Sequence, residues 1–433
     1  MAGPVPTYLL PDTAVIAEDG RLSVGGCDLV DLADEFGTPL FVYDEAHLRA
    51  RCREAVRAFG PGVAYASKAF LCGAMARLAH EEGMDLDVAT GGELFVARNA
   101  GIPGNRLVMH GNNKSEQELA MAVEEGVGRI VVDSFDELDR LDALAASTGT
   151  KPRVLLRITP GVEAHTHEFV ATGQDDSKFG FTVSNGLATA AVERARAAGS
   201  VDLVGLHAHI GSQVFDVRAF DRAVEVLASF SAPFGLPELS VGGGLGVPYV
   251  EGESAPSLTE WAAGIRAVCD EVGVVARVSA EPGRAIVASA AVTLYRVGTI
   301  KDLPGIRTYV SVDGGMSDNP RPVLYGSGYE TLLPRAADAE RRRAVRVVGK
   351  HCESGDLLVR EGWVPDDLVV GDVLATPVTG AYGYAMGSNY NHVLRPAVVF
   401  VTGGEARVVV RRESYADLVS REAIDLGPSK SKS

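Results

Sequence analysis

The sequence predicts an α/β fold in which an eight-stranded, TIM-like (β/α)8 barrel is joined to a second, mostly β domain. Between residues 63 and 281, eight short apolar runs alternate with Ala- and Leu-rich segments of helical period. After about residue 290 the helical period is lost, and strand-like runs follow one another across turns. Polar residues stand at the ends of the apolar runs, which is the edge where barrel enzymes hold their sites.

The barrel strands are predicted from near-continuous apolar runs, which are typical of parallel strands covered by helices on both faces. Eight such units favour closure into a barrel. An open sheet stays the alternative, because strand order cannot be derived from one sequence. The predicted strands are residues 63–67, 86–89, 106–110, 129–133, 154–159, 203–209, 238–242 and 277–281. The helical segments between them include 73–82, 92–100, 116–125, 135–146, 187–198 and 258–272.

The segments on either side of the barrel differ from it. Residues 1–43 alternate short strands and turns around one helical stretch at 30–36. The predicted barrel therefore occupies 44–289, and residues 290–433 form a β-rich part whose last residues, 427–433, are expected to be a disordered tail. Its strand-like runs are 292–300, 308–313, 344–349, 357–358, 373–377, 397–402 and 406–412.

Composition limits the classes of partner. The 433 residues carry a formal net charge of −16, which argues against nucleic acid or an anionic membrane as a partner. No apolar run reaches about 18 residues, and the N-terminus lacks the basic region and apolar core of a secretion signal. The five cysteines are scattered and show no CxxC spacing, as in proteins with reduced thiols. We therefore expect a cytoplasmic protein.

Reactive groups stand at the ends of the first and last predicted strands. Lys68 follows the run at 63–67, and burial at a barrel mouth lowers the pKa of a lysine and favours the neutral amine that attacks a carbonyl. Glu281 ends the last run, where a carboxylate can hold a proton on a ring nitrogen. Arg284 can bind phosphate or carboxylate. The alternatives are a solvated lysine at the rim and a simple salt-bridged pair.

The sixth and seventh predicted strands end in histidines and glycines. His207 and His209 form an HxH pair, but no Cys/His/Asp cluster of matching spacing accompanies it, so no metal is expected. A second HxH pair, His165 and His167, stands in a predicted loop. An imidazole stacked on a cofactor is favoured for His209, whereas a hydrogen-bonded structural role is the alternative, more so for His207. The glycines at 242–244 let backbone N–H groups approach an anion, with a tight turn as the alternative.

Together these residues supply an amine, a flat stacking group, a phosphate cradle and a carboxylate for a ring nitrogen. That is the set that pyridoxal 5'-phosphate (PLP) needs. The combination is more specific than any of its parts, and it predicts a PLP site at the barrel mouth.

The same motifs resemble those of the fold-type-III PLP-dependent decarboxylases, whose barrels are alanine-racemase-like, and within them most closely the diaminopimelate decarboxylases. The likeness runs from about residue 38 to residue 414. The matching stretches in the barrel are 65–69, 87–93, 110–114, 165–168, 177–180, 209–213, 242–246 and 281–284. In the C-terminal part they are 313–316, 321–325, 352–356 and 380–382.

This resemblance implies roles for individual residues. The catalytic residues would be Lys68, His209, Glu281 and Cys352. Lys68 would bind the cofactor covalently, and His209 would stack on the cofactor ring. Glu281 would pair with the ring nitrogen, and Cys352 would be the proton donor. Further cofactor contacts are implied for Ser212, Gly243, Gly244, Pro282, Gly283, Arg284 and Tyr382. Substrate contacts are implied for Arg284, Arg321, Tyr325, Glu353 and Tyr382.

The resemblance also implies an assembly and an activity. Cys352 and Glu353 would come from the neighbouring subunit of a homodimer with shared active sites, and residues 1–43 would join the C-terminal sheet. The expected reaction is decarboxylation of meso-2,6-diaminopimelate to L-lysine and carbon dioxide, the last step of lysine biosynthesis. The nearest alternative is a decarboxylase of ornithine, lysine, arginine or carboxynorspermidine. A PLP-dependent racemase, a non-catalytic PLP carrier and a metal-dependent barrel hydrolase are more distant alternatives.

Overall fold

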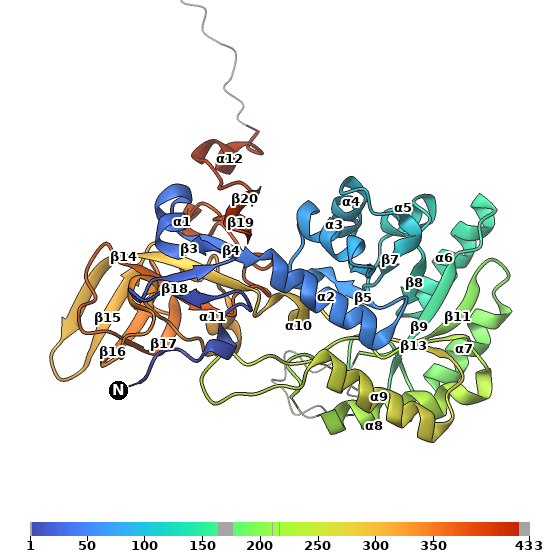
Figure 1. Ribbon diagram of the computed structural model, residues 1–433. Helices are drawn as coiled ribbons and strands as arrows, with labels where there is room; N and C mark the ends of the chain where they lie inside the picture. Colours follow the sequence, from blue (N-terminus) through green and yellow to red (C-terminus); the bar gives the residue numbers. More distant parts are fainter. Residues whose placement is uncertain (1, 163–175, 210, 216, 424–433) are drawn as a thin grey trace, which may run out of the picture.

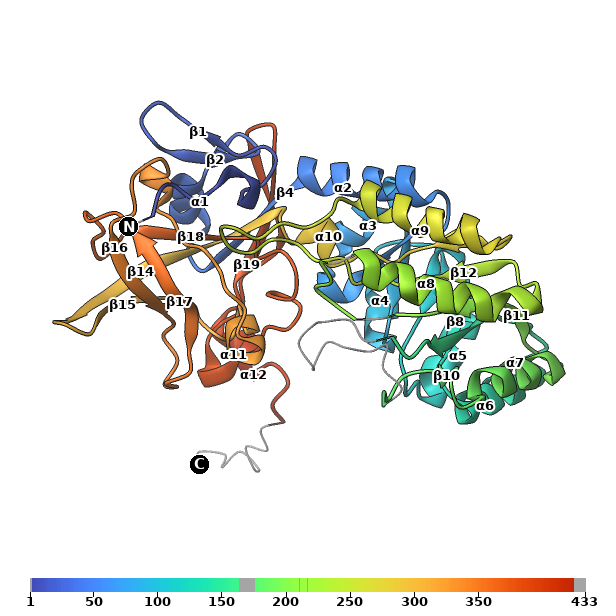
Figure 2. The ribbon, with the colours of Figure 1, turned by 90° about the horizontal axis from the view of Figure 1, so that it is seen from below.

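The protein has two lobes that lie side by side in both views of the chain (Figures 1 and 2). The computed structural model describes residues 2–162, 176–209, 211–215 and 217–423. One lobe consists of parallel strands surrounded by helices, and the other is a mixed sheet. The matched motif at 165–168, which includes the second HxH pair, and the predicted tail at 427–433 lie outside the described residues.

The first lobe is a closed barrel of eight parallel strands in the described part of the chain, and their order follows the sequence. The Ala64 N–H donates to the carbonyl of Ala280 at 3.0 Å, and the Ala66 N–H donates to that of Pro282 at 3.2 Å, so the residues directly after the last strand bond to the first strand and close the barrel. The predicted barrel is confirmed, and the open sheet is excluded. Its strands are β5 Ala64–Ala66, β6 Asp85–Val88, β7 Leu107–Met109, β8 Arg129–Val132, β9 Arg153–Thr159, β11 Asp202–His207, β12 Glu238–Ser240 and β13 Arg277–Ser279, with β10 Phe181–Thr182 beside β9.

Helices cover the outside of the barrel (Figure 2). Capping boxes begin two of them, Ser115 with Glu118 in α5 and Ser257 with Glu260 in α9, and the left-handed Gly273 ends α9. No helix in the described ranges is both long and apolar enough to cross a membrane. The helices of this lobe are α2 Glu45–Phe59, α3 Gly73–Glu81, α4 Gly91–Asn99, α5 Glu116–Glu124, α6 Phe135–Thr148, α7 Leu187–Ala197, α8 Val217–Ser231, α9 Leu258–Val272 and α10 Arg284–Val287.

Small apolar side chains fill the interior of the barrel below its mouth. A separate buried cluster takes one residue from each of five strands: Ala64, Val108, Val131, Leu155 and Val204. Side chains alternate along a strand, so the residue two positions later points to the same side. For the first four strands of this cluster those later residues are Ala66, His110, Asp133 and Arg157. The apolar cluster therefore closes the barrel from below, and a mostly polar ring faces its C-terminal mouth.

The second lobe contains a sheet of strand order β17-β16-β15-β14-β4-β19-β20, with β18 paired to β14. Strand β4 comes from the N-terminal segment and lies between β14 and β19, antiparallel to the first and parallel to the second. The limits 44–289 for the barrel stay a prediction. The strands are β4 Leu40–Asp44, β14 Ala291–Leu303, β15 Arg307–Val312, β16 Arg343–Val348, β17 Leu357–Val364, β18 Val373–Pro377, β19 Ala397–Thr402 and β20 Glu405–Val410. Beside them lie β1 Val15–Ile16, β2 Leu22–Val24, β3 Cys27–Asp28, α1 Leu29–Phe36, α11 Arg321–Tyr325 and α12 Tyr415–Val419.

Buried contacts hold the two lobes together next to the barrel mouth. The Tyr43 ring of β4 stacks on Phe70 of the barrel lobe with 4.4 Å between ring centroids, and its hydroxyl is held by the carbonyl of Gly380, to which it donates at 2.8 Å within the second lobe. The N–H of Tyr382 donates to the carbonyl of Ala69 at 2.8 Å. Because Ala69 follows Lys68 directly, this last bond places Tyr382 beside the end of strand β5.

Candidate active site

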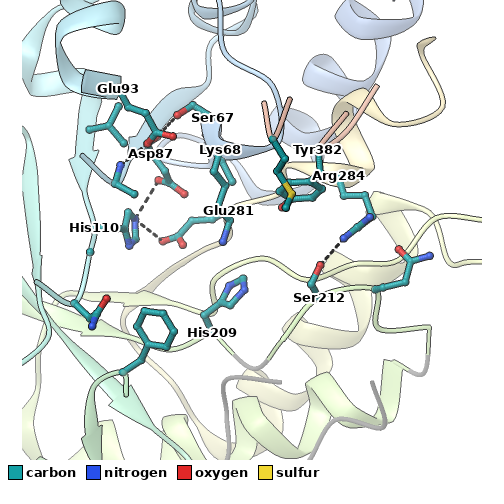
Figure 3. A pocket seen from close by; sticks show the side chains of 18 of the residues that line it. Ser67, Lys68, Asp87, Glu93, His110, His209, Ser212, Glu281, Arg284 and Tyr382 are labelled. Carbon is teal, nitrogen blue, oxygen red and sulfur yellow. Dashed lines mark hydrogen bonds and ion pairs between the residues drawn. The ribbon is translucent and has the colours of Figure 1, made fainter. Parts of the chain in front are cut away.

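A cavity of about 810 Å³ opens at the C-terminal ends of the barrel strands, and residues of both lobes line it (Figure 3). Most of the predicted site residues meet here. The predicted residues in its lining are Lys68, His209, Ser212, Glu281, Arg284, Arg321, Tyr325 and Tyr382. A smaller recess beside the cavity is lined by three more of them, Gly244, Pro282 and Gly283.

Lys68 lies in a single 3-10 turn, Ser67–Ala69, directly after β5. The hydroxyl of the buried Ser67 donates to the carbonyl of Asp87 at 2.5 Å, which ties this turn to the neighbouring strand β6. The sequence predicted a partly buried amine, whereas the Lys68 side chain is exposed to the cavity. The position of Lys68 is therefore as predicted, and its amine is open to a ligand.

Two carboxyl groups that the sequence did not single out lie near Lys68, namely Asp87 and Glu93 (Figure 3). Burial raises the pKa of Asp87 well above its usual value, and repulsion from Glu281 raises it further. Burial also raises the pKa of Glu93, whose carboxylate accepts a hydrogen bond from the Ala89 N–H at 2.6 Å. The positive charge of Lys68 opposes both shifts. Both residues belong to the matched motif at 87–93. The sequence therefore indicated that this stretch matters, but not what the two carboxyl groups do.

His209 is fixed by the glycine turn after β12. Its Nδ1 accepts a hydrogen bond from the Gly243 N–H at 3.1 Å. A side chain on Gly242 or Gly243 would clash with backbone, because an added Cβ would lie 2.3 Å from the carbonyl oxygen of Ala208 or of Glu281. Burial lowers the pKa of His209 well below its usual value, and the charge of Lys68 lowers it further. His209 is therefore a neutral, flat side chain at the wall of the cavity.

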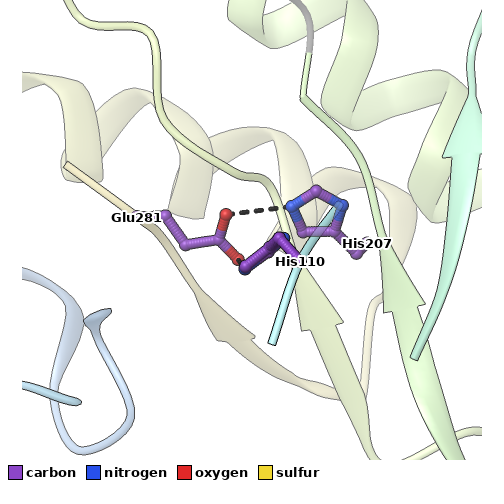
Figure 4. Close-up of side chains that lie close together, drawn as sticks. All are labelled: His110, His207 and Glu281. Atoms are coloured by element: carbon purple, nitrogen blue, oxygen red, sulfur yellow. Dashed lines mark hydrogen bonds and ion pairs between the residues drawn. The ribbon is translucent and has the colours of Figure 1, made fainter. Parts of the chain in front are cut away.

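Glu281 follows β13 and meets two direct hydrogen-bond donors. Its Oε2 lies 2.9 Å from Nε2 of His207, and its Oε1 accepts a hydrogen bond from the Ser240 hydroxyl at 2.6 Å. Burial alone would raise the pKa of Glu281, but His207, the nearby His110 and the Ser240 hydrogen bond outweigh burial, so this pKa lies below its usual value. Atoms of His110, His207 and Glu281 lie within 4.8 Å of one another (Figure 4). Glu281 is therefore a buried carboxylate anion at the floor of the cavity.

Arg284 begins α10 and reaches across the recess. Its guanidinium donates to the Ser212 hydroxyl at 2.7 Å and to the Tyr249 hydroxyl at 2.6 Å, and it lies 4.8 Å from the ring centroid of Tyr382 (Figure 3). The preceding Gly283 packs so closely on β5 that an added Cβ would lie 2.9 Å from the carbonyl oxygen of Ala66. A cation, a hydroxyl and glycine backbone therefore converge on one small space.

Arg321 brings a second cation to the cavity from the β lobe. It is buried, donates to the Tyr329 hydroxyl at 2.5 Å and lies over the ring of Tyr249 at 4.1 Å from the centroid. Tyr325, at the other end of α11, also lines the cavity. An arginine held in this way is prepared to bind a carboxylate.

Cys352 and Glu353 are the predicted residues that one chain does not bring to its own cavity. Both are exposed, and neither is among the residues that line the cavity. Gly243 is also absent from the lining, although its N–H holds His209. The Cys352 N–H donates to the side-chain oxygen of Asn391 at 2.9 Å.

Sequence reasoning also missed other residues of the lining, among them His110 and Arg157 of the barrel and Met386 of the β lobe. Burial lowers the pKa of His110 to about 3, so this side chain is neutral at physiological pH. Arg157 is buried and lies over the Phe179 ring, 4.1 Å from its centroid. A signal existed for the first two, because each stands two positions after an apolar residue of the barrel interior.

Comparison with known proteins agrees with this geometry. The profile described as "Pyridoxal-dependent decarboxylase, pyridoxal binding domain" matches residues 45–288. Diaminopimelate decarboxylase of Mycobacterium tuberculosis is 50% identical over 427 residues, which cover 94% of this chain and 95% of the relative. The chain belongs to the diaminopimelate decarboxylase family. The enzyme of that name from Bacillus subtilis is 46% identical over 418 residues, covering 93% of this chain and 95% of the relative.

Solved structures of this family share the fold. Diaminopimelate decarboxylase from M. jannaschii has a TM-score of 0.89 and 32% identity, covering 96% of this chain and 98% of the other. The structure from Helicobacter pylori in complex with L-lysine has a TM-score of 0.83 and 31% identity, covering 90% and 98%. These comparisons confirm both the predicted family and the combination of a barrel with a β domain.

Proposed function

We propose that this member of the diaminopimelate decarboxylase family converts meso-2,6-diaminopimelate to L-lysine and carbon dioxide with PLP as its cofactor. The observation that carries the proposal is the convergence of Lys68, His209, Glu281 and Arg284 on one cavity. Relatives at 50% identity over 94% of the chain have this name, and solved relatives from M. jannaschii and Helicobacter pylori are complexes with L-lysine. Decarboxylases of other basic amino acids are not favoured, because the lysine/ornithine decarboxylase from Vibrio vulnificus, at 22% identity, shares only the fold.

The cavity fits PLP group by group. Lys68 offers an exposed amine for the aldehyde. Glu281, held as an anion, is suited to the protonated ring nitrogen, and the neutral His209 is suited to the flat ring. Ser212 and Arg284 stand at the glycine-lined recess beside the cavity, where they would bind the phosphate together with backbone N–H groups. Pro282 and Tyr382 also line this recess.

Bound PLP would take up the electron pair left on the α-carbon when carbon dioxide departs. The protein's own residues would prepare that step. Glu281 would keep the proton on the ring nitrogen, and Lys68 would hold the cofactor until a substrate amine replaces it. Arg321, fixed by Tyr329, would bind a substrate carboxylate, with Tyr325 beside it. The Tyr382 ring, packed on the Arg284 guanidinium, would border both cofactor and substrate.

We also propose a homodimer in which the active sites are shared. The partner subunit's Cys352 would return a proton to the α-carbon, and the partner subunit's Glu353 would contact the far end of the substrate. Exposure of both residues, together with their absence from the lining of their own cavity, supports this arrangement. The cytoplasm is the compartment we propose, since all five cysteines are free thiols.

Supplying four amino acids to the purified protein tests the reaction. With PLP present, meso-diaminopimelate is expected to release carbon dioxide and form L-lysine, whereas lysine, ornithine and arginine are expected to release none. Lys68→Ala should abolish the release, and the matched exposed-strand variant Lys301→Ala should leave it intact. Release from ornithine but not from meso-diaminopimelate would contradict the proposed substrate.

Mixing two inactive variants tests the shared site. Lys68→Ala and Cys352→Ala each damage a different half of it. Random exchange of subunits would give half hybrid dimers, each with one intact site, so about a quarter of the wild-type activity should return. If mixing restores no activity although the subunits exchange, the two residues do not come from different chains.

A further inference from the structure

We propose that His207 and Ser240 are positioning residues, which hold Glu281 in place and in its anionic form for the ring nitrogen of PLP. Figure 4 shows the contact between His207 and Glu281. This inference rests on the proposed function. The resemblance to known decarboxylases implies a role for Glu281 but none for His207 or Ser240, and a hydrogen-bonded structural role is the alternative that the sequence offers for His207.

Three neighbouring strands bring these side chains to one level. His207 of β11 is paired with Ser240 of β12, and Ser240 is paired with Ser279 of β13. Glu281 stands two positions after Ser279, so its side chain points to the same side of the sheet as Ser240. The barrel therefore fixes the three groups relative to one another before any ligand binds.

Each carboxylate oxygen of Glu281 has one direct partner. Oε2 lies 2.9 Å from Nε2 of His207, and Oε1 accepts from the Ser240 hydroxyl at 2.6 Å. A carboxylate can only accept hydrogen bonds, so the hydrogen must be on Nε2 of His207. Both donors therefore favour the ionised carboxyl, and a proton on either oxygen would weaken the hydrogen bond that this oxygen accepts.

Burial makes these two donors important. His207 is 1% exposed, Ser240 is 3% exposed and Glu281 is 7% exposed. A buried carboxylate without donors is costly, and it takes up a proton instead of remaining charged. If Glu281 carried the proton itself, it would not hold that proton on the ring nitrogen. The strength of the ring as an electron sink therefore depends on residues behind Glu281.

The other groups around Glu281 cannot replace them. Nε2 of His110 lies 3.8 Å from Glu281 and 3.4 Å from Asp87, and it has no hydrogen bond within the described residues. Burial keeps His110 neutral, with a pKa of about 3. Asp87 repels the charge of Glu281, while the buried Arg157 attracts it without a hydrogen bond to it. Direct donation therefore comes from His207 and Ser240 alone in the described part of the chain.

Equilibrium dialysis of PLP against the apoenzyme tests the proposal. Ser240→Ala and His207→Leu should each weaken PLP binding about tenfold, which corresponds to about 1.4 kcal/mol. His207→Gln keeps an N–H donor and should recover most of the affinity. If His207 acts through Glu281, His207→Leu should change affinity less than about twofold when Glu281→Gln is already present. The absorption spectrum of bound PLP should shift in the same variants that lose affinity.

Two buried residues away from the cavity serve as controls. His47→Leu and Ser231→Ala replace side chains that are equally buried, and they should leave PLP affinity and spectrum unchanged. Ser240→Ala, which changes one atom, decides the matter if His207→Leu fails to fold. Wild-type affinity in Ser240→Ala and His207→Leu would overturn the proposal, and so would an equal loss with and without Glu281→Gln. Failure of the wild-type protein to bind PLP would instead overturn the proposed function.

Discussion

Lys114 stabilises the barrel through a buried ion pair, and its replacement by methionine should be strongly destabilising. Lys114 and Glu137 are each 1% exposed, and their charged atoms lie 2.7 Å apart. The Lys114 ammonium also donates to the carbonyl of Gly111 at 2.7 Å and to that of Val131 at 2.6 Å. All three of its hydrogens therefore have acceptors, and they link the loop after β7 to strand β8 and helix α6.

The magnitude follows from what Lys114→Met leaves behind. Methionine fills similar space but donates nothing, so Glu137 and two carbonyls lose a donor. Breaking a buried ion pair costs about 3–5 kcal/mol. The loss is limited because Glu137 can take up a proton, and burial already raises its pKa in the wild-type protein. We therefore expect a loss of about 3–5 kcal/mol in the free energy of unfolding near neutral pH.

The pH dependence of this loss has a definite sign. Without Lys114, the pKa of Glu137 in the folded state rises further above its unfolded value, because its compensating cation is gone. A group of this kind stabilises the folded state at low pH and ceases to do so as the pH rises through its folded pKa. The variant should therefore be closer to the wild type in stability at pH 5 than at pH 8.

Urea unfolding followed by circular dichroism measures these differences. The double variant Lys114→Met/Glu137→Leu removes both charges and should be more stable than Lys114→Met alone, since no unpaired carboxyl stays buried. A loss below about 0.5 kcal/mol in the single variant, within the range of ordinary surface substitutions, would refute the reasoning. A double variant less stable than the single one at both pH values would also refute it.

Three further predictions concern the site and the β lobe. Lys68→Ala should lose the visible absorption of enzyme-bound PLP together with carbon dioxide release, and persistence of both would show that another residue attaches the cofactor. Cys352→Ala should bind PLP as the wild type does but turn over about 10²–10⁴ times more slowly, the usual contribution of a general acid, whereas full activity would remove its role as proton donor. Burial raises the pKa of Asp318 to about 7, so its carboxyl stabilises the fold at low pH and this contribution is lost as the pH rises through about 7. Asp318→Asn should flatten the fall in stability between pH 5 and pH 8 in urea unfolding, and an unchanged slope would contradict the assignment.

Apolar periodicity predicted the barrel well, and its failures have physical causes. Helix α2 was not among the predicted helices, because its sequence is rich in Arg and Glu and its buried face includes His47 and Glu54. Helix α8 was also missed, although buried residues recur at helical spacing in Phe220, Val224 and Leu227. In α2 tertiary packing overrides a weak pattern, whereas in α8 the pattern was present in the sequence.

The part of the site that lies at the ends of the barrel strands could be predicted from the sequence. Residues at strand ends converge on the mouth in any closed barrel, which is why Lys68, His209 and Glu281 could be placed together. The contact between His207 and Glu281 joins residues that are 74 positions apart, at the ends of two strands separated by β12, and no local pattern reports it. Asp87 was inside a matched motif, but its raised pKa depends on burial and on Glu281, which only the folded chain brings near.

The loop that carries Cys352 is exposed at its tip and fixed at its base. The Asp356 carboxylate is buried and accepts hydrogen bonds from the N–H groups of Met316 at 2.6 Å and His351 at 2.9 Å, and from the His351 ring at 2.9 Å. The His351 ring stacks on Tyr390. Ordering a loop costs conformational entropy, and here that cost is met during folding and not on association. Cys352 is thus held in a fixed loop but does not line the cavity of its own chain. Such a thiol is suited to the cavity of a second subunit, which supports the proposed shared site.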